Sequence, residues 1–182
     1  MISLGSLFSR KPQPLLGLDI SSSSLKLVEL DHDAVGNLVL KRCAIEPLER
    51  GWITDGNIEK FDEVAEAMRR LVKKSGTRTK NVAMALPPSA VITKRIVLPG
   101  GLSDLELEVQ VESEANQYIP FSLDEVSLDF CVVGPSASSA GDVDVLIAAS
   151  RKEKVQDRQG LAEAAGLNPV ILDIESYSAP LA

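Results

Sequence analysis

The segment of residues 15–30 constrains the fold most, because its pattern predicts two short strands joined by a run of serines. Its first strand carries Asp19, and the returning strand carries Lys26. Hydroxyl and turn N–H groups at the end of a strand form a cluster of donors that suits a phosphate. A carboxylate there suits a hydrated Mg²⁺, which takes few protein ligands. The serines that form the turn are Ser21, Ser22, Ser23 and Ser24.

An ordinary polar hairpin is the alternative interpretation of this segment, since serine is a common turn residue. The chain contains neither the P-loop motif G-x-x-x-x-G-K-[ST] nor the dinucleotide motif G-x-G-x-x-G. A phosphate site would therefore be built from a serine turn and not from a glycine-rich loop.

The composition is that of a globular protein large enough for one domain, or for a small domain with another inserted into it. Hydrophobic residues make up 45% of the 182 residues and charged residues 25%. The net charge of −7 argues against nucleic-acid binding and against broad adhesion to an anionic membrane. No run of residues has the length and apolarity of a membrane span, and residues 1–14 lack the pattern of a signal peptide. We therefore expect a cytoplasmic protein.

The titratable residues outside the first hairpin give little sign of catalysis. Cys43 and Cys131 fall in predicted strands without metal or redox spacing, so we expect buried free thiols. The single histidine, His32, lies in a polar turn between two aspartates. A zinc site or a hydrolase triad would need additional partners near it.

The hydrophobic pattern predicts an α/β chain with one unit inserted into another. A three-stranded antiparallel meander covers residues 15–20, 24–30 and 37–48, and a helix over 61–75 leads to a parallel strand at 80–86. A strand–helix–strand–strand unit follows over about 87–150, and then a helix, a strand and a helix: residues 152–166, 168–174 and 175–182.

The inserted unit contains two patterned segments. In its first strand, residues 90–98, Val91, Thr93, Arg95 and Val97 alternate with Ile92, Lys94, Ile96 and Leu98, so the two sets point to opposite sides. A capping box at Ser103 and Glu106 begins a helix that ends near Tyr118. On that helix a mixed stripe suggests a functional face; it consists of Leu105, Val109, Glu112 and Asn116.

Several motifs in this order resemble one family over nearly the whole chain: GLDISSSSLKLVEL (17–30), AIEPL (44–48), SAVITKRIVLPGGLSDLELE (89–108), EANQYIPFSLDEVSLDF (114–130), VDVLIAASRKEKV (143–155) and AGLNPVILDIESYSA (165–179). They resemble the PilM family of type IV pilus assembly proteins, which are relatives of the cell-division protein FtsA. The resemblance implies the actin/Hsp70-like ATPase fold.

The resemblance also implies a division into subdomains. Residues 15–86 and 151–182 would form subdomain 1A, residues 87–150 would form the inserted subdomain 1C, and residues 1–14 would be a flexible tail. PilM proteins are about twice this length, so the chain would be truncated and would lack the second lobe.

For the hairpin, the resemblance implies half of an ATP–Mg²⁺ site. Asp19 would hold Mg²⁺ through water, Ser21 to Ser24 would contact the phosphates with Lys26, and Asp173 and Glu175 would lie near the interdomain hinge. Actin and FtsA carry glycine in this turn, and serine is costlier in unusual backbone conformations. We expect the isolated chain to bind ATP weakly or not at all.

The function implied is that of a scaffold at the inner face of the inner membrane. It would capture the N-terminal tail of the membrane protein PilN and meet the membrane only through PilN. It would link motor and other pilus assembly proteins to the inner-membrane platform of the pilus machine. It could also form a homo-oligomer. The tail would lie along Val91, Thr93, Lys94 and Arg95, although a solvated strand face explains Lys94 and Arg95 equally well. We expect little or no turnover. The alternatives are an actin-fold ATPase with real turnover and an FtsA-like cell-division protein.

Overall fold

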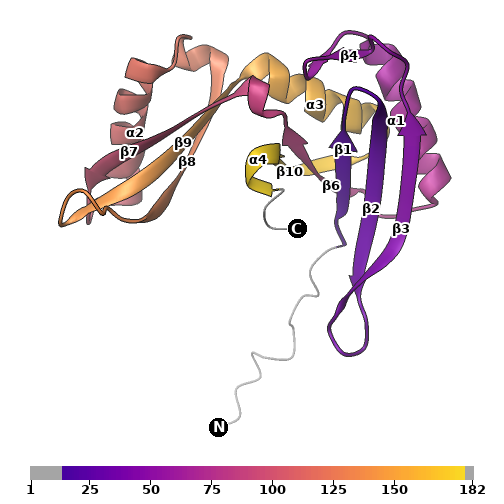
Figure 1. Ribbon diagram of the computed structural model, residues 1–182, viewed down its shortest axis with the longest axis horizontal. Helices are drawn as coiled ribbons and strands as arrows, with labels where there is room; N and C mark the ends of the chain where they lie inside the picture. Colours follow the sequence, from indigo (N-terminus) through magenta and orange to yellow (C-terminus); the bar gives the residue numbers. More distant parts are fainter. Residues whose placement is uncertain (1–13, 179–182) are drawn as a thin grey trace. The chain divides into compact units, whose positions relative to one another are not determined.

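The computed structural model describes residues 14–178, which divide into two compact units (Figure 1). The first unit holds residues 14–54, 58–85 and 159–172, and the second holds 55–57, 86–158 and 173–178. Residues 151–158 and 173–178, which the sequence assigned to subdomain 1A, group here with the inserted unit. Most of the predicted tail, residues 1–13, lies outside the described residues.

The first unit is built on a five-stranded sheet in the order β10-β6-β1-β2-β3. The ladders β1–β2 and β2–β3 are antiparallel, whereas β1 and β6 are parallel. The structure thus confirms the predicted meander and the crossover that returns parallel to it. The strands are β1 (Leu16–Ile20), β2 (Ser24–His32), β3 (Leu38–Pro47), β6 (Asn81–Leu86) and β10 (Asn168–Ile174).

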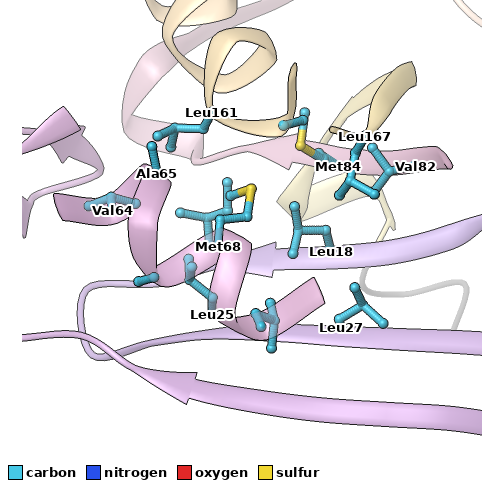
Figure 2. Close-up of a cluster of buried hydrophobic side chains, with 14 of the residues drawn as sticks. Leu18, Leu25, Leu27, Val64, Ala65, Met68, Val82, Met84, Leu161 and Leu167 are labelled. Carbon is cyan, nitrogen blue, oxygen red and sulfur yellow. The ribbon is translucent and has the colours of Figure 1, made fainter. Parts of the chain in front are cut away.

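The helix α1 (Phe61–Ser75) covers one face of this sheet, because its apolar stripe matches the period-2 pattern of the strands. Val64, Met68 and Leu71 are fully buried, and Figure 2 shows Val64 and Met68 in one cluster with Leu18, Leu25 and Leu27 of the sheet. Helix α3 (Lys152–Ala164) adds Leu161 to this core. The helix α1 ends at Gly76, whose φ of 63° is the left-handed C-cap that glycine favours.

The opposite face of the same sheet is open in the described residues, and this corrects one prediction. Cys43 lies opposite Val28 in the β2–β3 ladder and is exposed, because its neighbour Ala44 takes the inward position. Cys131 lies opposite Leu146 in the second unit and is also exposed. The expectation that both thiols are buried was wrong, since a strand pattern alone does not say which face is covered.

The second unit is a three-stranded antiparallel sheet in the order β7-β9-β8, with α2 packed on one face (Figure 1). Its strands are β7 (Val91–Pro99), β8 (Val126–Pro135) and β9 (Asp142–Arg151), and α2 spans Asp104–Tyr118. The predicted capping box is present, with Ser103 as N-cap: its hydroxyl accepts from the Glu106 N–H, and the Glu106 carboxylate accepts from the Ser103 N–H.

Four short elements were not predicted: β4 (Ile53–Thr54), β5 (Asn57–Ile58), and the 3₁₀ turns η2 (Pro88–Ala90) and η3 (Leu123–Glu125). Of the predicted terminal helix, α4 (Glu175–Ser178) is present, and residues 179–182 lie outside the described residues. Between residues 14 and 178, no helix combines the length and apolarity needed to cross a membrane.

One buried carboxylate ties the β2–β3 ladder to the segment that follows α1. Glu29 is 2% exposed; it accepts hydrogen bonds from the hydroxyls of Thr77 (2.8 Å) and Thr79 (3.2 Å) and pairs with Arg42 (3.2 Å) and Lys41 (3.3 Å). Burial raises the pKa of Glu29, but the hydrogen bonds and the two cations outweigh it and hold the pKa below its ordinary value.

We expect Glu29→Gln to lower the free energy of unfolding at pH 7 by about 1.5–3 kcal/mol, the range for hydrogen bonds to a charged group. Because the folded pKa is lowered, the stabilisation is present above the unfolded value of 4.5 and is lost as the pH falls through the folded pKa. Urea unfolding at pH 7 and at stepwise lower pH measures both effects. The variant should show the flatter pH dependence, and equal slopes for the two proteins would contradict the assignment.

Candidate functional site

The serine turn closes the β1–β2 hairpin, and two of its serines are used to hold it. Ile20 faces Leu25 in the ladder, and Ser21 and Ser24 follow as the next facing residues. The N–H and the hydroxyl of Ser21 both donate to the Ser24 carbonyl, at 3.1 and 2.9 Å. Ser22 and Ser23 lie at the tip and are exposed, and their hydroxyls make no hydrogen bond within residues 14–178. These two hydroxyls are therefore available to a ligand.

The backbone of the turn is ordinary. Among the described residues, the only non-glycine residue with a positive φ is Asp55, so all four serines adopt conformations open to any L-residue. The backbone cost anticipated for serine does not arise in this turn.

Asp19 and Lys26 face each other across the same hairpin, on the side away from the buried Leu18 and Leu27. The Lys26 ammonium is 2.7 Å from the Asp19 carboxylate, and both side chains are about half exposed. An exposed ion pair contributes at most about 1 kcal/mol. Exchanging it for a phosphate on Lys26 and a hydrated cation on Asp19 therefore costs little, so these residues fit the chemistry of Mg²⁺ and a phosphate chain.

Asp173 and Glu175 belong to the second unit, whereas the serine turn belongs to the first. Asp173 lies near the end of β10 and is exposed, with its carboxylate accepting from the neighbouring Ile174 N–H at 2.7 Å. Glu175 is the first residue of α4. Within residues 14–178, no three His, Cys, Asp or Glu side chains gather as a metal cluster.

The strand predicted as a peptide groove divides between two faces. Thr93 and Arg95 lie on the side of Val91, and Arg95 is 3.7 Å from Asp144. Lys94 lies on the other side, with its ammonium 4.7 Å from the centre of the Tyr118 ring. Of the four predicted residues, Val91 lines the pocket described next.

This pocket has a volume of about 340 Å³ and lies at the start of β7, entirely within the second unit. Its walls are apolar, formed by Val91, Ile92, Ile119, Phe121, Val126 and Ala149. Its polar lining includes Asp55, Arg151 and Lys154, and the Arg151 guanidinium lies 5.0 Å from the centre of the Phe121 ring. A concave apolar site with a few polar groups at its border suits an apolar side chain within a polar segment.

A buried arginine supports one border of the pocket. Arg158, on α3, is 2% exposed and donates to the Gly56 carbonyl at 3.2 Å. Asp55 and Gly56 have φ values of 51° and 81°, and a Cβ on Gly56 would come within 2.7 Å of Pro87, so this turn requires glycine. Ser89 donates to the Asp55 carbonyl from the other side at 3.2 Å.

Sequence reasoning missed Asp55, Arg151, Lys154 and Arg158 as parts of one site. The Asp-Gly pair is a known hairpin signal and could have revealed the turn. The two basic residues and Arg158 carried no comparable signal, because the segments that they contact are far away in the sequence.

Comparison with known protein families shows which family this chain belongs to. The family described as type IV pilus assembly protein PilM matches residues 17–182. The chain belongs to the PilM family. A solved structure titled PilM–PilN type IV pilus biogenesis complex is 35% identical in sequence, with a TM-score of 0.79, over 92% of this chain and 49% of that one. The chain thus spans about half the length of that PilM structure.

A second structure supports the fold alone. The cytoplasmic domain of EpsL, an inner-membrane component of the type II secretion system of Vibrio cholerae, matches with a TM-score of 0.52 and 14% identity. The match covers 88% of this chain and 57% of that one. Together the PilM and EpsL matches confirm the predicted actin-like ATPase fold.

We expect Arg158→Met to lower the free energy of unfolding by about 1–3 kcal/mol, because it removes a buried guanidinium and leaves the partly buried Gly56 carbonyl without this donor. Lys152→Met is the matched control: Lys152 also donates to a backbone carbonyl, that of Asp124 at 2.8 Å, but from an exposed position. The control should change stability by no more than about 0.5 kcal/mol. Thermal and urea unfolding measure both, and equal losses would contradict the role of Arg158.

Proposed function

We propose that this chain is the first lobe of a pilus assembly adaptor that captures the N-terminal tail of PilN. The observation that carries the proposal is its 35% identity to a PilM chain solved as a PilM–PilN complex. The apolar pocket at the start of β7 supports it. Through PilN, the adaptor would link motor and other assembly proteins to the platform at the cytoplasmic face of the inner membrane, in support of twitching motility.

The pocket suggests how such a tail is held. β7 is an edge strand of the order β7-β9-β8, so its outer edge is open to an extended peptide. Main-chain hydrogen bonds along that edge would supply affinity, and an apolar side chain of the tail would enter the pocket beside Phe121. Asp55, Arg151 and Lys154 would then meet polar groups of the tail.

We also propose that the longer protein binds ATP with Mg²⁺ and hydrolyses it little. Ser22, Ser23 and Lys26 would hold phosphate oxygens, and Asp19 would hold Mg²⁺ through water. Bound there, Mg²⁺ would neutralise phosphate charge. For Asp173 and Glu175, the resemblance to the PilM family would imply positions near the interdomain hinge. The family match favours a role in pilus assembly over that of an FtsA-like cell-division protein.

A peptide titration tests the first proposal. We expect a synthetic PilN N-terminal peptide to shift the amide NMR signals of residues around the pocket, among them Val91 and Phe121. Val91→Asp should weaken binding about tenfold or more, because it places a charge among apolar walls. Val97→Asp is the control, since it lies on the same side of the same strand but outside the pocket lining. No shifts, or equal loss in both variants, would refute the proposal.

Calorimetry tests the second proposal. In the longer protein, Lys26→Met and Asp19→Asn should each weaken binding of ATP with Mg²⁺ about tenfold, because each removes a charge that meets the phosphates or the cation. Lys73→Met, at the exposed end of α1, should change nothing. The 182-residue chain alone should bind ATP weakly or not at all, so micromolar affinity for it would contradict the incomplete site.

A further inference from the structure

The outward side of α2 carries apolar side chains that its own unit does not bury. Leu107, Val111 and Ala115 point inward and are buried, as the core of the second unit requires. Leu105 and Val109, one helical turn apart on the other side, are 71% and 60% exposed. They belong to the mixed stripe that the sequence pattern identified, and neither proposed site uses them.

A hollow of about 390 Å³ adjoins this stripe. One wall comes from α2 and the other from η3 and its N-cap Ser122, so the hollow lies within the second unit. An apolar side chain therefore lies directly beside a concave surface with hydroxyl, amide and carboxylate groups. The lining residues are Val109, Glu112, Ser113, Asn116, Ser122, Leu123 and Asp124.

The charged residues that line the hollow, Glu112 and Asp124, are both acidic. Every charged residue of α2 is acidic, and η3 adds further carboxylates. Glu106 is occupied by the capping box, but the carboxylates of Glu112 and Asp124 make no ion pair within residues 14–178. The neighbouring cation Lys152 donates to the backbone carbonyl of Asp124 and not to its carboxylate. The acidic residues of α2 are Asp104, Glu106, Glu108, Glu112 and Glu114.

We propose that this α2 face, defined as Leu105, Val109 and the adjoining hollow, docks a cationic amphipathic segment of a partner protein. Burying Leu105 and Val109 favours apolar side chains on the partner, and the unpaired carboxylates favour Lys or Arg beside them. A second copy of this chain is disfavoured, because its net charge is −7 and two such faces would repel each other. The surface is separate in residues from the β7 pocket, so this inference does not depend on PilN binding.

The test uses a short synthetic peptide of Leu and Lys in which the Leu residues are spaced to form one face of a helix and the Lys residues the other. A scrambled peptide of the same composition is the comparison. Fluorescence anisotropy with the 182-residue chain should show saturable binding of the first and at least about tenfold weaker binding of the second. NMR shifts should concentrate in α2 and η3. The affinity should fall as salt rises, since part of it is electrostatic.

Two double variants locate the surface. Leu105→Ser with Val109→Ser, and Glu112→Lys with Asp124→Lys, should each weaken peptide binding about tenfold while leaving the thermal unfolding temperature unchanged, because these side chains are exposed or border an open hollow. The control is Leu38→Ser with Leu40→Ser, an apolar pair of β3 with similar exposures of 65% and 60%. That control should leave the affinity unchanged.

Three results would overturn the proposal. The peptide could fail to bind saturably, or all variants could bind it equally, which would indicate attraction to an acidic protein in general. Alternatively, light scattering could show a dimer of the chain that Leu105→Ser with Val109→Ser dissociates, which would assign the α2 face to a second copy.

Discussion

The packing of α1 against one face of the five-stranded sheet is the contact on which the first unit depends. Leu16, Leu18, Leu25 and Leu27 face the helix and are buried. Because side chains alternate along a strand, this burial sends Asp19 and Lys26 to the other face, where they meet at 2.7 Å. A slip of either strand by one residue would turn its leucines outward and its charged residue inward, and would separate Asp19 from Lys26. The same apolar contact that stabilises the sheet therefore also positions the candidate phosphate site.

The two units offer different chemistry. The first presents hydroxyls, an ammonium and a carboxylate at a hairpin, with the ammonium and the carboxylate on the exposed face of the sheet. The second presents an apolar pocket at the start of β7 and an acidic, partly apolar helix face on α2. The chemistry of the first arrangement suits a small anionic ligand, and that of the second suits peptide segments, which is the basis of the separate proposals for the two units.

Much of the fold could be predicted from local patterns. The helix over 61–75 has the predicted bounds because its apolar stripe, its acidic first turn and Gly76 all agree. The capping box placed the start of α2, and the parallel return of β6 followed from the strand–helix–strand order. The exposed thiols of Cys43 and Cys131 were mispredicted, since both faces of a half-covered sheet can carry apolar residues.

By itself, the sequence determined the order of the elements, the serine hairpin with its facing charges, the mixed stripe on α2 and the resemblance to the PilM family. These features depend on spacings of a few residues, which a sequence displays directly. Only the tertiary structure decided that Lys94 lies over the Tyr118 ring, that Arg151 reaches Phe121, and that Arg158 supports the turn at Gly56. Such contacts join residues separated by tens of positions, and the packing of whole elements selects them.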